Sequence, residues 1–225
     1  MKFDQIQATA VAKPIFPEPA LRPAPMVSWT LRYRAFKRSV DLLFSLAVLP
    51  IIGMVAAGLF VANPFLNPGP VFYRQTRMGM GGRRFTMWKF RTMTPSAEAV
   101  RAFDAPVEVH RITVLGRFLR TTRIDEFPNV INILRGEMTL IGPRPDAWEH
   151  AILCIDAIPY YRDRFRVKPG ITGLAQIRSG YADTRRAMQR KARLDRFYVY
   201  HSQIMLDLLI MRKTVRVMCT GFGAK

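Results

Sequence analysis

The longest apolar stretch of the chain covers residues 42–62, where 21 consecutive positions carry no charged side chain. As a straight helix this stretch would be about 31 Å long, close to the thickness of the hydrocarbon core of a bilayer. Pro50 lies near its middle, where proline removes a helical hydrogen bond and bends the axis. Ser45, about one turn earlier, is placed to satisfy the carbonyl group that the proline frees. The pattern predicts a bent helix that enters a membrane.

Basic residues flank this stretch on both sides. A spanning helix would place one basic group on the wrong side of the membrane by the positive-inside rule, whereas a re-entrant helix keeps both on the cytoplasmic face. We therefore expect a re-entrant helix, with a spanning helix and a buried core helix as alternatives. The basic residues before and after the stretch are Arg32, Arg34, Lys37, Arg38, Arg74, Arg77, Arg83, Arg84, Lys89 and Arg91.

The rest of the chain has shorter and mixed periodicities, which predict a mainly α fold with a few short strands (α+β). A turn signal at residues 67–70 separates it from the apolar stretch. Residues 202–218 form an amphipathic pattern, which fits either a helix lying on the membrane surface or an ordinary helix facing the core. The other expected elements are strands at 71–73 and 85–90 and helices at 95–102, 113–122, 125–136, 145–165 and 183–200.

These patterns divide the chain into three parts. Residues 1–30 are expected to be a flexible tail, because five prolines fall within twelve residues there and no apolar run typical of a secretory signal occurs. Residues 31–66 hold the basic flank and the re-entrant membrane helix, and residues 67–225 form a compact cytosolic domain with amphipathic surface helices.

The chain carries 35 basic and 16 acidic residues, and its formal net charge is +19. Such an excess requires anionic partners: nucleic acid, anionic lipid or phosphorylated substrates. We expect no nucleic-acid partner, because no known binding signature is present and the apolar stretch would be unexplained. Two cysteines without a CxxC pair and three scattered histidines give no sign of a disulfide framework or a zinc site.

The segment with the clearest chemistry is Asp125-Glu126-Phe127-Pro128. Adjacent carboxylates are common on surfaces, but proline suits the first turn of a helix, which places this pair near a helix start that attracts anions. Two carboxylates among arginines can bind magnesium together with a diphosphate. Alternatively, one can attack phosphorus while the other positions a group or accepts a proton. The neighbouring arginines are Arg111, Arg117, Arg120, Arg123, Arg135 and Arg144.

Two loops supply further candidate phosphate ligands. Arg144 stands between Pro143 and Pro145, where a stiff backbone would hold its guanidinium group as a phosphate clamp, or simply as part of a structural turn. Lys168 opens a glycine-containing loop at residues 168–173 that is neither a P-loop nor a dinucleotide-binding fingerprint.

Taken together, these motifs resemble the bacterial monotopic phosphoglycosyl transferases, the initiating sugar transferases of exopolysaccharide and capsule synthesis. The resemblance runs from about Lys37 to about Val217, and the order of its motifs is highly specific. A re-entrant helix is also a trait of that family, and the short region before it resembles the minimal form. The motifs are Lys89-Phe90-Arg91-Thr92-Met93, Asp125-Glu126-Phe127-Pro128-Asn129, the run from Asn132 to Met138, Gly142-Pro143-Arg144-Pro145 and Pro169-Gly170-Ile171-Thr172-Gly173.

The resemblance implies transfer of hexose 1-phosphate from a UDP-sugar to polyprenol (undecaprenyl) phosphate, with Mg²⁺ and a phosphoryl-aspartate intermediate, releasing UMP. It implies that Asp125 is the nucleophile and that Glu126 is its partner, and we expect both as magnesium ligands. It also implies a bacterial inner membrane location with the catalytic domain on the cytoplasmic face and contact with membrane lipid. The sequence does not give the oligomeric state, although exposed apolar helices would suit a homodimer. The other residues that the resemblance places in or near the site are Arg120, Arg144, Lys89, Lys168 and Asp195.

The chain departs from the family pattern at four places. Leu49 stands where serine is frequent, Lys168 where arginine is usual and Leu174 where tryptophan is common, and residues 179–181 differ from the usual Asn-Gly-Arg. The last three departures affect contacts with sugar and base more than the chemistry. The sequence does not name the sugar, and similarity to enzymes that start exopolysaccharide synthesis favours glucose or galactose. The alternative to an enzyme is a non-catalytic membrane scaffold that keeps the fold. The intact Asp-Glu pair argues against this alternative.

Overall fold

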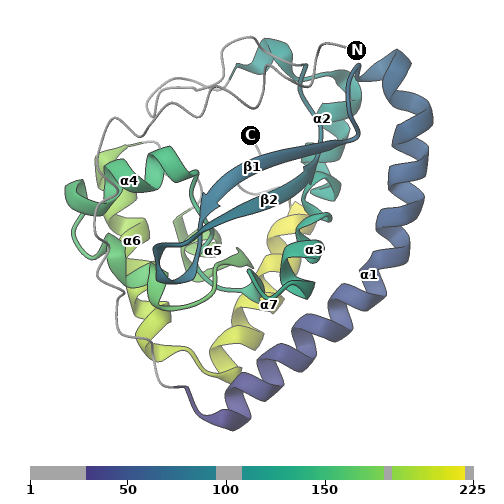
Figure 1. Ribbon diagram of the computed structural model, residues 1–225. Helices are drawn as coiled ribbons and strands as arrows, with labels where there is room; N and C mark the ends of the chain where they lie inside the picture. The colour runs from purple at the N-terminus through teal and green to yellow at the C-terminus, as the bar shows by residue number, and fades with distance from the viewer. Residues whose placement is uncertain (1–28, 95–107, 180–183, 221–225) are drawn as a thin grey trace.

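The computed structural model describes residues 29–94, 108–179 and 184–220. A long helix, α1 (Leu31–Leu66), runs along one side of a body built from shorter helices and two small sheets (Figure 1). This arrangement confirms the expected mainly α architecture with a few short strands and one long apolar helix. The proline-rich stretch up to residue 28 and the helix expected at 95–102 lie outside the described residues.

Helix α1 changes direction part-way along its length and follows the body (Figure 1). Pro50 lies inside the helix and accounts for a bend there, since it has no amide hydrogen to donate. The expected role of Ser45 is wrong. Its side chain is fully buried against the body, and its hydroxyl group has no hydrogen-bond partner in the described part of the chain.

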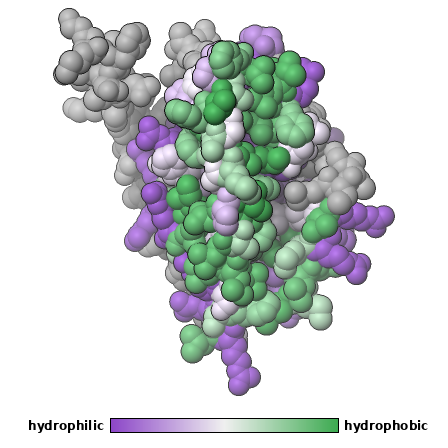
Figure 2. All heavy atoms as spheres, turned by 90° about the vertical axis from the view of Figure 1, so that its right-hand side faces the viewer, coloured by the Kyte–Doolittle hydropathy of each residue, from purple (hydrophilic) through white to green (hydrophobic). Residues whose placement is uncertain are grey.

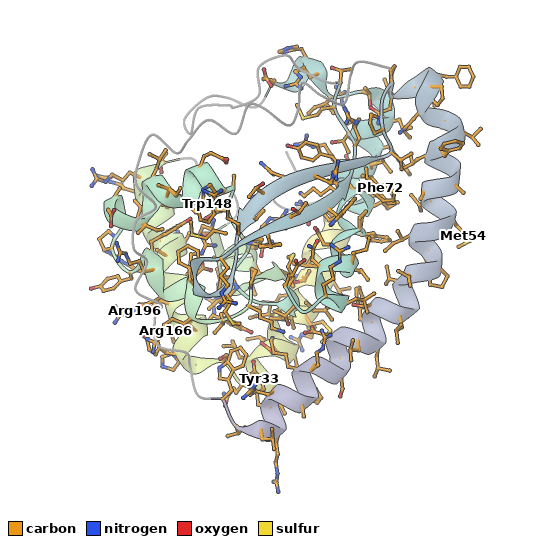
Figure 3. All side chains as sticks on the ribbon, viewed as in Figure 1. Tyr33, Met54, Phe72, Trp148, Arg166 and Arg196 are labelled. Carbon is orange, nitrogen blue, oxygen red and sulfur yellow. The ribbon has the colours of Figure 1, made fainter. Side chains whose placement is uncertain are left out.

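The face of α1 that points away from the body is apolar and exposed. Figure 2 shows hydrophobic side chains gathered along this helix, and Figure 3 shows Met54 on its outer side. By length and composition α1 is able to cross a membrane, and only 17% of its most apolar 18-residue stretch is buried. That exposure is incompatible with a buried core helix. The exposed large side chains include Leu43, Leu46, Met54, Phe60, Val61 and Phe65.

Both halves of α1 are bonded to the same body. Near its start, the Arg38 guanidinium group donates to the backbone carbonyls of Ile133 and Leu134, at 2.7 and 3.0 Å. Just after its end, the side-chain amide of Asn67 donates to the Arg91 carbonyl at 2.9 Å. The two ends of the helix are therefore tied to one folded unit.

The chain next forms an antiparallel hairpin of β1 (Phe72–Met78) and β2 (Arg84–Phe90). Tyr73 lies opposite Lys89, and Arg77 lies opposite Phe85. The second strand agrees with the expected one, but the first is longer than predicted. Most of β1 is exposed or half-buried and carries polar side chains, so its apolar alternation is too weak to show in the sequence.

The segment around the acidic pair differs from the single helix expected over residues 125–136. Helix α2 (Val114–Thr121), capped by the Thr113 side chain, is followed by a 3₁₀ turn η3 (Ile124–Glu126) and a short helix α3 (Asn129–Leu134). Arg123 precedes the turn in the left-handed conformation (φ 60°), which reverses the chain there. The pair therefore belongs to a tight turn before α3 rather than to the helix itself.

A second sheet holds the two loops singled out in the sequence side by side. Strands β3 (Thr139–Ile141) and β4 (Gly170–Thr172) are parallel, and Gly142 follows β3 directly. A Cβ atom on Gly170 would lie 2.1 Å from the Gly142 nitrogen, so this contact requires glycine. The close approach fixes where the chain leaves β3.

The remaining helices are α4 (Trp148–Ala157), a 3₁₀ segment η4 (Tyr161–Arg166), α5 (Leu174–Ser179), α6 (Arg185–His201) and α7 (Ile204–Thr220). They largely confirm the helices expected at 145–165 and 183–200, with a break at Tyr160, which is left-handed. Helix α7 combines both readings of its pattern. Ile210 is buried in the core, while Met205, Leu208 and Val215 are exposed.

Candidate active site

Glu126 is a buried carboxylate held by two cations from other segments and by one from its own turn. The Arg144 guanidinium group binds both of its oxygens, with Nη1 at 2.9 Å from Oε2 and Nη2 bonded to Oε1. Lys89 Nζ lies 3.2 Å from Oε1, and Arg123 Nη1 lies 3.9 Å from the same oxygen. Burial raises the pKa of Glu126, but Arg144 and Lys89 outweigh it and hold the pKa far below its usual range. Glu126 is therefore ionised at neutral pH.

Asp125 is equally buried but has a different environment. Its Oδ1 atom is inaccessible to water and has no hydrogen-bond partner among the described residues. Burial first, and then the charge of Glu126, raise the pKa of Asp125 above its usual value, against weaker effects of Lys89, Arg144 and Arg120. A buried carboxylate oxygen without a partner is costly, and Asp125 is the member of the pair that has such an oxygen.

Local backbone geometry brings these side chains together. The left-handed Arg123 starts the turn that holds Asp125 and Glu126. Lys89 comes from β2, and Arg144 from the loop directly after β3. Arg144 also donates to the Ile171 carbonyl at 3.1 Å, which ties the guanidinium group to β4.

The pairing of the Arg144 guanidinium group with both oxygens of Glu126 is called the clamp below. Sequence reasoning gave little weight to Arg77, which binds the backbone next to Arg144. It donates to the Pro145 carbonyl at 2.9 Å and to the Gln75 side chain at 2.6 Å. Burial lowers its pKa, and the nearby charge of Arg144 lowers it further. The register of the hairpin places Arg77 on the same face as Lys89, and this shared face is the signal that could have indicated a position near the site.

A buried charged cluster supports Arg144 from behind, and its centre is Asp146, which sequence reasoning missed. Asp146 binds Lys191 Nζ at 2.6 Å, the Tyr161 hydroxyl at 2.6 Å and the Arg164 guanidinium group. Arg164 also donates to the backbone carbonyl of Arg144. The adjacency of Asp146 to the Pro-Arg-Pro segment was the available signal.

Asp195 belongs to this same cluster, because its Oδ2 lies 3.3 Å from Arg164 Nη2. The structure therefore places Asp195 behind the clamp, and none of its described contacts is with Asp125 or Glu126. Burial raises the pKa of Asp195, and Arg164 opposes this rise. Asp195 is thus linked to the site only indirectly among the described residues: it binds Arg164, and Arg164 donates to the backbone carbonyl of Arg144.

The other two predicted cations lie at different distances from the pair. Arg120 is close enough for its charge to lower the pKa of Asp125. Lys168 instead lies near the end of α3, and the charges that act on its pKa are those of Arg38, Asp41 and Arg34. No described contact joins Lys168 to Asp125 or Glu126.

The residues present suit a magnesium ion held mainly by Asp125. The described residues contain no group of three or more candidate ligand side chains, but Mg²⁺ binds through one or two carboxylates together with substrate phosphates. Asp125 Oδ1 has no described hydrogen-bond partner that a metal would have to displace, whereas both oxygens of Glu126 already bind Arg144. Glu126 would have to exchange that partner to coordinate a metal.

Comparison with known proteins places the chain among related sequences. The bacterial sugar transferase family model matches residues 32–221. The chain is 37% identical over 193 residues to UDP-N-acetylgalactosamine-undecaprenyl-phosphate N-acetylgalactosaminephosphotransferase of Aeromonas hydrophila, covering 86% of this chain and 46% of the relative. It is 39% identical over 182 residues to UDP-glucose:undecaprenyl-phosphate glucose-1-phosphate transferase of Klebsiella pneumoniae, covering 80% and 39%.

A relative from Caulobacter vibrioides, also named UDP-glucose:undecaprenyl-phosphate glucose-1-phosphate transferase, is 35% identical over 204 residues, covering 90% of this chain and 75% of the relative. The chain thus spans less than half the length of the Aeromonas and Klebsiella relatives. The matched region includes the turn of Asp125 and Glu126, the hairpin of Lys89 and the loop of Arg144. Since one family model matches well over half of its length, the chain belongs to the bacterial sugar transferase family.

Proposed function

We propose that this chain transfers hexose 1-phosphate from a UDP-sugar to polyprenol phosphate through a phosphoryl-aspartate intermediate and releases UMP. The observation that carries the proposal is the asymmetry of the acidic pair. Glu126 is locked by cations, whereas Asp125 presents a buried oxygen without a partner. The printed names of the relatives, which join UDP-sugars to undecaprenyl phosphate, support the same donor and acceptor.

In the first half-reaction, an Asp125 carboxylate oxygen attacks the phosphorus atom that bears the sugar. The new bond joins this oxygen to phosphorus, and the bond to the bridging oxygen breaks, so that UMP leaves with the bridging oxygen and its electron pair. Attack by a carboxylate that is poorly solvated and close to cations is a known route to acyl phosphates. Lys89 and Arg144 are placed to stabilise the negative charge on the phosphoryl oxygens.

In the second half-reaction, an oxygen of the polyprenol phosphate attacks the same phosphorus atom. The acyl phosphate bond breaks, Asp125 regains its carboxylate, and the product is a polyprenol diphosphate sugar. Glu126 keeps Arg144 and Lys89 at one position through both steps, because it is ionised at neutral pH. It is therefore suited to orient the cations that bind phosphate.

Magnesium fits this scheme as an ion held by Asp125 and by phosphate oxygens of the donor. When bound, it would neutralise charge on the diphosphate and so make UMP a better leaving group. Arg144 and Lys89, which bind Glu126, supply further positive charge beside the acidic pair.

We also propose that α1 is re-entrant, so that the catalytic body lies on one face of the membrane, the cytoplasmic face of the bacterial inner membrane. The contacts that Arg38 and Asn67 make with one body at opposite ends of the helix support this topology. The exposed apolar outer face of α1 would then contact the lipid acyl chains, close to the polyprenol acceptor.

The test is UMP release by the purified protein with Mg²⁺, undecaprenyl phosphate and a panel of UDP-sugars. Asp125→Asn should lower turnover by at least about 10⁴-fold and should abolish the sugar-phosphate adduct seen by intact-protein mass spectrometry. Glu149→Gln, an exposed carboxylate on α4, is the matched control and should keep full activity.

Two results would contradict the proposal. An adduct that still forms on the same peptide in Asp125→Asn would exclude Asp125 as the nucleophile. Absence of UMP release from the wild-type protein with every UDP-sugar would favour a membrane scaffold that keeps the fold without the activity.

A further inference from the structure

Two charged residues lie on the buried side of the membrane helix, one turn apart. Lys37 is 8% exposed and Asp41 is 4% exposed, although the apolar stretch of α1 begins at the next residue. Buried charges are costly unless they are paired and hydrogen-bonded. The burial of Lys37 and Asp41 therefore indicates that this side of α1 does more than anchor the chain in a membrane.

Asp41 binds strand β3 and no other described element. Its Oδ1 accepts a hydrogen bond from the Leu140 backbone amide at 2.8 Å and another from the Thr139 hydroxyl group at 3.0 Å. These bonds join residues that are nearly a hundred positions apart in the chain. A carboxylate on α1 thus fixes the start and the middle of β3.

Lys37 fixes the end of the same strand. Its ammonium group donates to the Ile141 carbonyl at 2.7 Å, to the Tyr198 hydroxyl at 3.1 Å and to Asp207 at 2.8 Å. Asp207 in turn accepts from the hydroxyl groups of Tyr33 and Tyr198, at 2.8 Å each. Helices α1, α6 and α7 therefore meet at the last residue of β3.

Strand β3 leads directly to the clamp on Glu126. Only Gly142 and Pro143 separate Ile141 from Arg144, and Gly142 is locked against Gly170. Arg144 is held on its far side by Arg164, which binds its carbonyl. Upstream, the arginine is consequently anchored by the pairing of β3 with β4 on one side and by the bonds from α1 to β3 on the other.

We infer that Asp41 and Lys37 are positioning residues that set the Arg144 guanidinium group against Glu126, so that the membrane helix forms part of the framework of the catalytic site. This inference rests on the proposed function for the meaning of the clamp. It extends that function by making the polar side of α1, and not only its apolar side, necessary for turnover. Loss of the bonds to β3 would let Arg144 shift, and small displacements of a phosphate-binding group lower the rate strongly.

The test is a double-mutant cycle between Asp41 and Arg144 in the full chain. Asp41→Ala should lower kcat for UMP release by about 10- to 100-fold, with a smaller change in KM for the UDP-sugar. Asp41→Asn keeps an oxygen that can accept both hydrogen bonds, so it should restore most of the rate. In an Arg144→Lys background, where the two-pronged clamp is already lost, Asp41→Ala should cost less than about threefold.

Ser45→Ala is the matched control, because Ser45 lies one turn further along the same buried face and its hydroxyl group has no described partner. It should leave kcat unchanged in both backgrounds. Equal losses from Asp41→Ala in the two backgrounds, or no loss in the wild-type background, would overturn the inference. If Asp41→Ala fails to fold, Thr139→Val removes one of the same bonds from the strand side, and the same cycle with Arg144→Lys decides.

Amide hydrogen exchange separates this inference from the proposed function. In Asp41→Ala, the peptide over residues 139–144 should exchange faster than in the wild type, whereas Ser45→Ala should not change it. Unchanged exchange would show that Asp41 does not anchor β3, whatever the activity. Absence of UMP release from a wild-type protein with protected β3 amides would instead contradict the proposed function alone.

Discussion

At the residue scale, two adjacent carboxylates acquire opposite properties from their neighbours. Glu126 receives Arg144 and Lys89, and so its charge is neutralised by protein groups. Asp125 is buried beside that charge without a hydrogen bond on Oδ1, and its pKa rises. Environments that push two pKa values apart are the usual way in which neighbouring acids take different roles. This division leaves the attack on phosphorus to Asp125.

The raised pKa of Asp125 predicts an acid limb in the pH profile. Only the ionised carboxylate attacks, so the single-turnover rate of adduct formation should fall as pH drops through the pKa of Asp125, at a higher pH than for an ordinary aspartate. In Glu126→Gln the rate should fall by about a hundredfold or more. The acid limb should also move to lower pH, because the second-largest cause of the raised pKa is removed.

The control for this experiment is Glu149→Gln on the exposed face of α4, which should keep both the rate and the limb. An acid limb that stays in place in Glu126→Gln would show that the charge of Glu126 does not act on the attacking group.

At the element scale, the sequence predicts what lies close along the chain and misses what folding brings together. The strand at 85–90 and the helix at 113–122 carry their own periodicity, and both are confirmed. The helix expected from Asp125 is replaced by a 3₁₀ turn, because the reversal at Arg123 depends on a left-handed conformation that spacing does not encode. Which carboxylate faces Arg144 follows from that turn, and so it could not be predicted either.

The charged cluster behind the clamp shows the same limit. Asp146 meets Tyr161, Arg164 and Lys191 from 15, 18 and 45 residues away, and no local pattern links them. Asp195 was identified through a family resemblance, whereas the sequence signal for Asp146 was its adjacency to the Pro-Arg-Pro segment. Long-range pairing of charges is decided by the packing of η4 and α6 on the loop after β3.

This cluster predicts a pH-dependent stability. Asp146→Asn would leave Arg164 and Lys191 without their main counter-charge, so it should lower the free energy of unfolding by about 3 kcal/mol at pH 7. Arg164 and Lys191 hold the folded-state pKa of Asp146 well below its usual value, against burial. The contribution is therefore complete above the unfolded pKa of about 3.9, and it is lost as pH falls toward the folded pKa.

Denaturant unfolding in detergent at pH 7 and at pH 3 measures this difference, which should be smaller at pH 3. Asp156→Asn removes an exposed ion pair with Arg162 and should change stability by less than about 1 kcal/mol at either pH. An Asp146→Asn penalty that is equal at the two pH values would mean that ionisation of Asp146 is not what holds the cluster.

At the scale of the whole molecule, α1 is both the lipid-facing element and a wall of the folded body. After its basic first turns its outer face is apolar and exposed (Figure 2), whereas its inner face carries Tyr33, Lys37 and Asp41 into the body. Tyr33 lies on the side of the helix that faces the other helices (Figure 3). An element with these two faces can dip into one leaflet while its inner face stays on the protein.

This arrangement predicts that both flanks of α1 lie on one side of the membrane. Single cysteines at Arg32 and Thr86, both exposed, would be placed in a background with Cys154→Ser and Cys219→Ser. A membrane-impermeant maleimide should label both from the same side of sealed vesicles, and a cysteine at Met54, on the outer face of α1, should be labelled at least about tenfold more slowly. The physical reason is that a spanning helix would place about 30 Å of hydrocarbon between its ends. It would thereby break the bonds of either Arg38 or Asn67 to the body.

Labelling of Arg32→Cys and Thr86→Cys from opposite sides would establish a spanning helix, and rapid labelling of Met54→Cys would place the outer face of α1 outside the lipid.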